Sequence, residues 1–241
     1  MKIKELEKPK LKKVKMMCDY CIDSKLEQQE SIKNCFSRHN FSIIAGLMGS
    51  GKTTLAIQLL RDVMEGIFEN LYVIIPEISL NSINEKHNIF KNELNEEEHL
   101  YYEYTADNLQ NIYDKLTENS LKGYNSIVLV DDFGSEFRTN KEAEKILNKI
   151  IIKIRHLRTS IWLLAQGITQ LPLKWRQMAT NLIMYNLGKS QMERIFDEFL
   201  RMNKKKFEEI MLLFKKPHDL LILNIKHNKL YFNWDEIILE D

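Results

Sequence analysis

Short apolar runs recur along the chain and alternate with segments of helical periodicity. A largely apolar run of four or five residues is typical of a strand buried on both faces of a parallel sheet. Apolar residues spaced three or four positions apart are typical of helices that pack on such a sheet. The predicted strands are residues 41–45, 71–75, 100–104, 127–130, 161–165 and 182–185, and the predicted helices between them include 53–64 and 107–118. The pattern predicts an α/β fold with a mostly parallel central sheet covered by helices on both faces.

Three further segments have less regular patterns. Thr139 followed by Glu142 has the form of a capping box, and it predicts the start of a helix whose apolar face runs from Ile146 to Leu157. Residues 77–99 are polar and rich in Asn and Glu, which predicts a helix with mobile loops. Residues 191–214 are expected to be helical, and 220–225 and 230–233 are expected to form a β-hairpin that closes the domain.

Composition limits the class of protein. The chain has 241 residues, of which 44% are hydrophobic and 29% charged, as is usual for a soluble globular domain. No apolar stretch approaches the roughly 20 residues that span a bilayer, and the first residues lack the apolar core of a secretory signal. The three cysteines are an odd number, which favours free thiols over a disulfide framework.

Charge is unevenly distributed, although the formal net charge is only +1. Residues 1–17 contain seven lysines and two glutamates, so the remainder of the chain is net acidic. We expect a solvated basic tail, with contact to phosphates or to an acidic partner as the alternative.

A phosphate-binding loop follows the first predicted strand. Residues 46–53 match G-x4-G-K-[ST] between a strand and a helix, which is the context that this motif requires. The glycines let successive N–H groups point at a phosphate, Lys52 reaches the β- and γ-phosphates, and Thr53 offers its hydroxyl to Mg²⁺. The predicted nucleotide contacts are Gly46, Leu47, Met48, Gly49, Ser50, Gly51, Lys52, Thr53 and Thr54.

Two acidic residues end the strand 127–130. Asp131 is placed to join Thr53 as a ligand of Mg²⁺, and Asp132 is the preferred base for an attacking water. Glu136, four residues further on, is the alternative base. The separation of 79 positions from Lys52 to Asp131 favours the P-loop NTPases that insert a strand between the phosphate-loop strand and the acidic strand.

A glutamine and several arginines follow the acidic strand. Gln166 ends strand 161–165, where an amide can orient water or sense the γ-phosphate. Arg155 or Arg158 could interact with a helix C-terminus or reach a neighbouring subunit's nucleotide as an arginine finger. Arg176 is a weaker candidate for a γ-phosphate or DNA contact.

Cys18, Cys21, Cys35 and His39 have a spacing compatible with a Cys3His zinc site. Three reduced thiols are the simpler interpretation, because C-x2-C is common and the flanks lack paired turn glycines.

These motifs together resemble the DNA-packaging ATPases of poxviruses, other large DNA viruses and virophages, which belong to the FtsK/HerA superfamily. The resemblance covers about residues 36–190. It rests on Asp131-Asp132, on Ile154 to His156, on Ser160 to Gln166, on Leu171-Pro172 and on Arg176 to Asn181. In FtsK-like motors the arginine finger lies eleven residues before the sensor glutamine, as Arg155 lies before Gln166. FtsK and HerA proteins usually carry Asp-Glu where this chain has Asp131-Asp132.

The resemblance implies a homo-oligomeric ring that hydrolyses ATP with Mg²⁺ at subunit interfaces. It implies translocation of double-stranded DNA into a preformed capsid, in the cytoplasm of an infected cell or in association with the virion, with no membrane partner. DNA contacts would come from pore loops, from Lys204 to Lys206 or from the basic tail, without sequence specificity.

The residues alone leave two other functions open. One is a nucleotide or small-molecule kinase, with an acceptor pocket in the long spacer. The other is an assembly factor that binds a nucleotide without hydrolysing it. The expected organisation of the chain is a basic arm and helix at 1–35, a P-loop ATPase core at 36–190, and a helical and hairpin extension of the same domain at 191–241.

Overall fold

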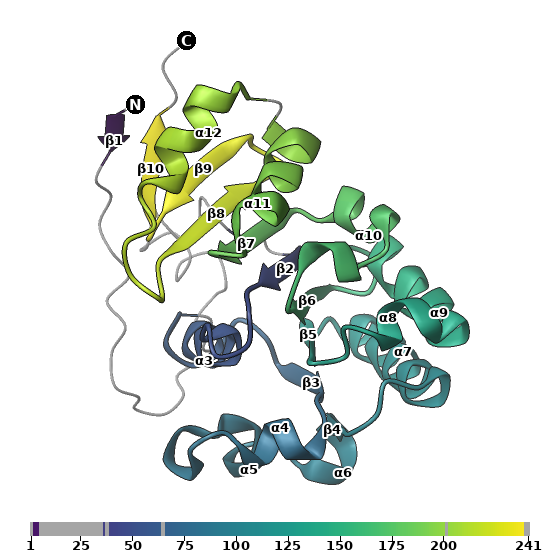
Figure 1. The fold of residues 1–241 in the computed structure, drawn as a ribbon. Coiled ribbons are helices and arrows are strands. Elements are labelled where there is room, and N and C mark those ends of the chain that lie inside the picture. The colour runs from purple at the N-terminus through teal and green to yellow at the C-terminus, as the bar shows by residue number, and fades with distance from the viewer. Residues whose placement is uncertain (1, 5–35, 37–38, 64–65, 201, 239–241) are drawn as a thin grey trace.

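The computed structural model describes residues 2–4, 36, 39–63, 66–200 and 202–238 (Figure 1). Within them one sheet of ten strands has the order β1-β10-β9-β8-β7-β2-β6-β5-β3-β4. The strands are β1 (Lys2–Lys4), β2 (Phe41–Ala45), β3 (Asn70–Ile74), β4 (Leu100–Tyr101), β5 (Ser126–Asp131), β6 (Thr159–Ala165), β7 (Asn181–Tyr185), β8 (Leu220–Asn224), β9 (Lys229–Phe232) and β10 (Asp235–Ile238). The predicted α/β fold with a mostly parallel core sheet is confirmed.

The sheet has a parallel part and an antiparallel part. The six strands from β7 to β4 pair in parallel, whereas β8, β9, β10 and β1 pair antiparallel with their neighbours. Strand β6 lies between β2 and β5. The predicted insertion of a strand between the phosphate-loop strand and the acidic strand is therefore correct.

Helices cover both faces of the sheet. The helical elements are α3 (Lys52–Gln58), η1 (Leu59–Val63), α4 (Glu77–Asn81), η2 (Glu85–His87), α5 (Ile89–Asn92), α6 (Glu96–His99), α7 (Ala106–Leu121), α8 (Glu136–Thr139), α9 (Lys141–Ile152), η3 (Ile168–Gln170), α10 (Leu173–Met178), α11 (Lys189–Ile195), η4 (Phe196–Leu200) and α12 (Lys204–Met211). Successive strand residues point to opposite faces, so neighbours such as Leu163 and Leu164 belong to different apolar clusters. One cluster packs under α3, α4 and α5, and the other packs under α7 to α12.

Several sequence predictions need correction. The capping box at Thr139 is wrong, because Thr139 ends α8 and the Asn140 side chain accepts the hydrogen bond from Ala143 N at 3.1 Å. Helix α9 ends at Ile152, before Arg155. The strand expected at 100–104 has only two residues, and the polar segment 77–99 forms four short helical elements.

The two ends of the chain extend the sheet. The hairpin of β8 and β9 is confirmed, but β10 and its pairing with β1 were not predicted. Lys2 to Lys4 therefore form a strand, while residues 5–35 lie outside the described part of the chain. Within the described residues, no helix is long and apolar enough to cross a membrane.

Candidate functional site

The phosphate loop joins β2 to α3 and is shaped by its glycines. Gly49 and Gly51 have φ angles of 75° and 97°, in the left-handed region that glycine adopts without a steric penalty. At Gly46 a Cβ would lie 2.3 Å from Ser50 Oγ and 2.8 Å from Tyr185 Cδ2, so a side chain there would force these neighbours to shift. Gly46 N donates to Ala165 O at 3.0 Å, which ties the start of the loop to the end of β6. The first turn of α3 then presents N–H groups that its own helix leaves without partners.

Lys52 folds back over this loop. Its Nζ donates to Gly46 O at 2.8 Å and to Leu47 O at 3.2 Å. Burial lowers the pKa of Lys52, and the charges of Asp131 and Asp132 oppose that shift. The ammonium group thus lies inside the loop, where it can neutralise a bound polyphosphate.

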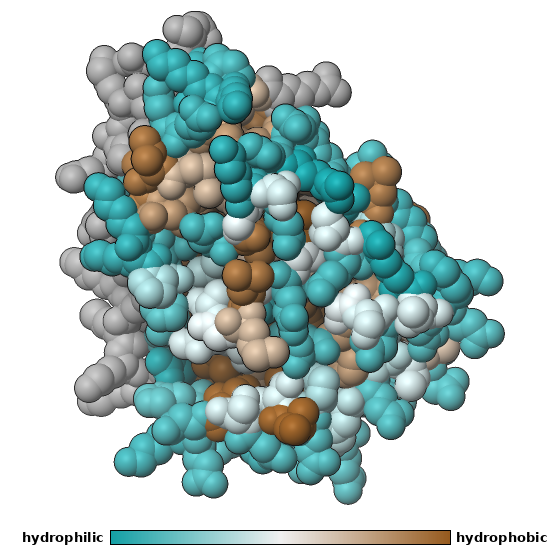
Figure 2. Space-filling model, viewed as in Figure 1, coloured by the Kyte–Doolittle hydropathy of each residue, from teal (hydrophilic) through white to brown (hydrophobic). Residues whose placement is uncertain are grey.

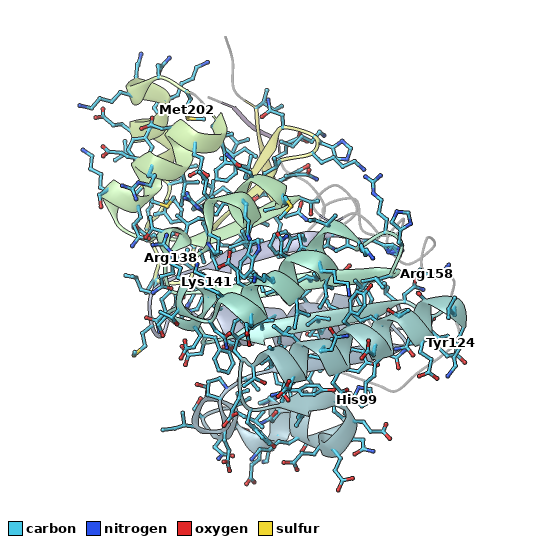
Figure 3. The ribbon with its side chains drawn as sticks, turned by 90° about the vertical axis from the view of Figure 1, so that its right-hand side faces the viewer. His99, Tyr124, Arg138, Lys141, Arg158 and Met202 are labelled. Carbon is cyan, nitrogen blue, oxygen red and sulfur yellow. The ribbon has the colours of Figure 1, made fainter. Side chains whose placement is uncertain are left out.

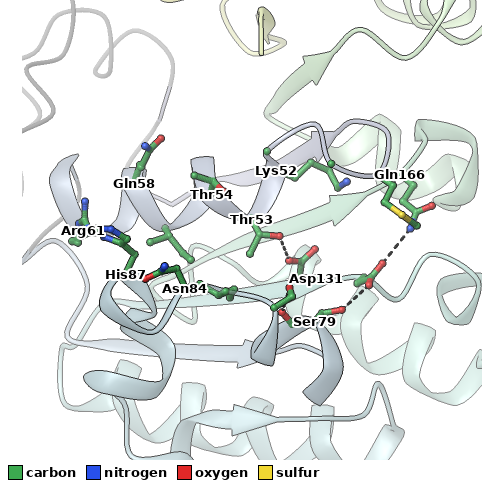
Figure 4. Close-up of a pocket in the computed structure, with 17 residues that line it drawn as sticks. Lys52, Thr53, Thr54, Gln58, Arg61, Ser79, Asn84, His87, Asp131 and Gln166 are labelled. Atoms are coloured by element: carbon green, nitrogen blue, oxygen red, sulfur yellow. Dashed lines mark hydrogen bonds between the residues drawn. The ribbon is translucent and has the colours of Figure 1, made fainter. Parts of the chain in front are cut away.

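Thr53 and Asp131 meet across the gap between α3 and β5. Thr53 Oγ1 donates to Asp131 Oδ2 at 2.5 Å (Figure 4). The Asp131 residue is only 3% exposed, and this burial raises the pKa of its carboxyl to about 6, although Thr53 and Lys52 lower it. A hydroxyl and a carboxylate in contact form a set of hard oxygen donors, so the two residues fit the Mg²⁺ role that the sequence predicts.

Asp132 differs from Asp131 in exposure and in backbone. Its φ is 64°, a left-handed conformation that is uncommon outside glycine, and its side chain is exposed. Gln166 Nε2 donates to Oδ1 at 3.2 Å, and Ser79 Oγ donates to Oδ2 at 2.8 Å. Asp132 and Gln166, which the sequence predicted, thus contact each other at the ends of β5 and β6. Ser79, which the sequence did not single out, also contacts Asp132.

A cavity of about 650 Å³ contains these side chains (Figure 4). It begins at the phosphate loop and continues between α3 and the segment from α4 to η2. Asp132 lines it but Glu136 does not, and Glu136 accepts instead from Ser135 Oγ at 2.6 Å. The geometry therefore favours Asp132 as the base. The lining residues are Met48, Gly49, Gly51 to Thr54, Ile57, Gln58, Arg61, Ser79, Ser82 to Asn84, His87, Asp131, Asp132 and Gln166.

Two residues that the sequence did not indicate hold the loop from its other side. Tyr185 OH donates to Gly51 O at 3.2 Å, and His218 Nδ1 lies 3.0 Å from Ser50 O. Burial raises the pKa of Tyr185 to about 12, so its hydroxyl stays a donor at neutral pH. Tyr185 ends a predicted strand and His218 lies in a loop, and neither position has a motif that could have revealed the contact.

The three arginines that the sequence singled out, Arg155, Arg158 and Arg176, do not line this cavity. Arg155 is exposed in the turn before β6, at the end of the strand opposite Gln166, and the seven residues of β6 separate them by about 20 Å. Figure 3 shows Arg158 and Tyr124 at one end of the α7 and α9 layer, with Arg138 and Lys141 at the other. Arg176 is buried and forms an ion pair with Glu198, so it does not face the site.

The remaining candidates are partly outside the described residues. Cys18, Cys21 and Cys35 are not described, so the zinc prediction stays a prediction, and the described residues contain no group of three or more His, Cys, Asp or Glu that could hold a metal ion. Lys204 and Lys205 are exposed in the first turn of α12. The surface in Figure 2 is largely hydrophilic, with separate hydrophobic groups; exposed apolar side chains include Met48 in the phosphate loop and Ile78 on α4.

The fold and the loop define the chain as a P-loop NTPase of the branch with a strand between the two phosphate-site strands. The model of the family described as Poxvirus A32 protein matches residues 28–238, which is most of the chain. The chain belongs to this poxvirus A32 protein family. A comparison with curated protein sequences found no match.

Solved structures show the same fold at low sequence identity. The DNA-packaging ATPase B204 of Sulfolobus Turreted Icosahedral Virus has a TM-score of 0.64 and 14% identity, over 85% of this chain and 100% of that one. The genome packaging NTPase B204 of Sulfolobus turreted icosahedral virus 2, in complex with ATP-gammaS, has a TM-score of 0.60 and 13% identity over the same shares. EssC (ATPases 2 and 3) from Geobacillus thermodenitrificans has a TM-score of 0.55 and 15% identity, over 82% of this chain and 39% of that one.

Proposed function

We propose that this protein is an ATP-hydrolysing, ring-forming motor that moves double-stranded DNA into a preformed viral capsid. The observation that carries the proposal is the meeting of Thr53 with Asp131 and of Asp132 with Gln166 beside the phosphate loop. Membership of the poxvirus A32 family and the fold shared with structures titled as genome-packaging NTPases support the choice of DNA packaging.

In this function each residue has a separate task. The backbone of 46–54 and the Lys52 ammonium bind the phosphates of ATP. Thr53 and Asp131 would hold Mg²⁺, which when bound neutralises charge on the β- and γ-phosphates. Asp132 accepts the proton of the attacking water, and Gln166 reports the presence of the γ-phosphate by changing its hydrogen-bond partner.

Arg155 supplies the missing cation of a neighbour's site. It is exposed and lies at the opposite end of β6 from its own phosphate loop, so it is poorly placed to serve its own site and free to serve another. Subunits arranged head to tail bring such opposite ends together and close into a ring.

DNA and the capsid are the other proposed partners. The exposed lysines at the start of α12 can bind phosphates without reading sequence, which suits a protein that tracks the DNA backbone. The site of action would be the cytoplasm of an infected cell, where virions assemble.

Steady-state ATP hydrolysis tests the function directly. We expect turnover that rises with long linear double-stranded DNA more than with an equal mass of single-stranded DNA. Lys52→Ala should reduce turnover by roughly 100-fold or more, because it removes the charge aimed at the transferring phosphate. Lys145→Ala, an exposed lysine on α9, is the matched control and should behave as wild type.

Two results would contradict this function. Turnover that survives Lys52→Ala would come from a contaminant or another site. Turnover that depends on Lys52 but ignores both forms of DNA would favour the kinase or the assembly factor over the motor.

A further inference from the structure

The Asp132 carboxylate accepts a side-chain hydrogen bond at each of its two oxygens. Its side chain is exposed, and its left-handed backbone, with a φ of 64°, sets the direction in which the side chain leaves the turn. In the described structure each carboxylate oxygen accepts one side-chain hydrogen bond, from Ser79 and from Gln166. These two donors decide where the carboxylate points.

The two donors are not equivalent in the proposed reaction. Gln166 follows β6, lines the cavity beside Lys52 and is the residue expected to turn toward the γ-phosphate. When its amide does so, Oδ1 of Asp132 loses that donor and becomes free to accept a proton from water. Ser79 has no competing task, and its hydroxyl can keep Oδ2 in place while Oδ1 acts.

Ser79 is itself held firmly. The next residue of α4, Leu80, is fully buried, and its carbonyl oxygen accepts from Asn88 Nδ2 at 3.1 Å. Ser82 Oγ donates to Ser79 O at 2.7 Å. The hydroxyl of Ser79 therefore projects from a fixed short helix toward the strand end that carries Asp132 (Figure 4).

We propose that Ser79 is a positioning residue that anchors one oxygen of the Asp132 carboxylate, so that the other oxygen is aimed at the attacking water. This role rests on the proposed ATP hydrolysis. It also gives the polar segment after β3 a function in that site, although this segment carries no recognisable motif.

The test compares Ser79→Ala with Ser79→Thr and with Ser135→Ala. The last variant removes the same hydroxyl from a serine that donates to the neighbouring Glu136, outside the cavity. We expect Ser79→Ala to lower kcat for ATP by about 10-fold with KM changed less than about 2-fold, because positioning acts on the chemical step and not on nucleotide binding. Ser79→Thr should recover most of kcat, and Ser135→Ala should match wild type.

A second readout does not require turnover. In nucleotide-free protein labelled with ¹³C at aspartate carboxyls, the Asp132 signal is identified by its loss in Asp132→Asn. It should move in Ser79→Ala and stay in place in Ser135→Ala. If wild type fails to hydrolyse ATP, the motor function fails, while this signal still decides whether Ser79 holds Asp132.

Three outcomes would overturn the role of Ser79. They are an unchanged kcat in Ser79→Ala, a loss expressed only in KM, and an Asp132 signal that is the same in Ser79→Ala and in wild type.

Discussion

Asp131 is a buried carboxyl whose pKa is raised by that burial, and its protonation is therefore tied to folding. Its carboxyl has a pKa of about 6 in the folded chain against a reference of 3.8. The folded state keeps the proton in a pH range where the unfolded state has lost it, so stability falls as pH rises from about 4 to about 6 and then stays level. Two pKa units correspond to about 3 kcal/mol.

Asp131→Asn should remove this penalty. In Mg²⁺-free and nucleotide-free buffer, we expect its free energy of unfolding, relative to wild type, to increase by up to about 3 kcal/mol between pH 4 and pH 7. Denaturant unfolding across that range measures the difference. Asp197→Asn, which changes an exposed carboxyl, is the control, and parallel curves for Asp131→Asn and wild type would refute the expectation.

At the scale of single elements, asparagine side chains begin several of the helices. Asn140 caps α9, Asn203 caps α12, and Asn84, Asn88 and Asn95 cap the short elements of residues 77–99. Asn140 also donates from Nδ2 to Tyr104 O at 3.1 Å, so it connects α9 to the segment before α7.

Asn140→Ala should destabilise the protein by about 1 kcal/mol through loss of the cap. Thr139→Ala should cost much less, because the Thr139 hydroxyl donates only to Ser135 O at 3.3 Å on an exposed turn. Thermal unfolding of the two variants compares these positions directly. A larger loss in Thr139→Ala would restore the capping box that the sequence suggested.

The elements also show why some were predictable from the sequence. Strands such as β5 are apolar throughout because both faces are buried, and that pattern is local and strong. The helices of 77–99 have no apolar face, and a few buried residues such as Leu80 and Phe90 hold them in place. Strand β10 is four residues long and follows a turn with left-handed Asn233 and Trp234, which is too short a pattern to recognise.

The residues of the candidate site also divide into those that the sequence predicted and those that it did not. The phosphate loop and the Asp131-Asp132 pair could be predicted, because the residues that act together in each of them are also neighbours in the sequence. Ser79 and His218 reach the site from loops or short helices far along the chain, and only the packed fold brings them there.

At the scale of the whole molecule, the sheet separates two kinds of charged group. The phosphate loop, Asp131, Asp132 and Gln166 follow the carboxyl ends of β2, β5 and β6, while Arg155 and Arg158 precede the amino end of β6. In the proposed motor, a site completed by an arginine from the other end of the sheet would therefore need two subunits.

Mixing variants tests this arrangement. Arg155→Ala subunits keep their own phosphate loop, and Lys52→Ala subunits keep their arginine, so co-assembled rings should recover up to about a quarter of wild-type turnover if neighbours pair at random. Lys52→Ala mixed with Asp132→Asn is the control, because both subunits lack part of the same half-site and should stay inactive. No recovery would contradict the role of Arg155. So would a loss of turnover in Arg158→Ala alone that mixing with Lys52→Ala subunits restores.

The left-handed backbone at position 132 also restricts which amino acids can replace Asp132 during evolution. Asp, Asn and Gly tolerate that conformation better than a longer side chain does. Asn and Gly would keep the fold but lose the proposed base. Glu would keep the charge but strain the turn and move the carboxylate past Ser79. The turn therefore favours an Asp-Asp pair at the position where FtsK and HerA proteins usually carry Asp-Glu. A substitution of Asp132 by Glu would have to occur together with a change in the turn itself.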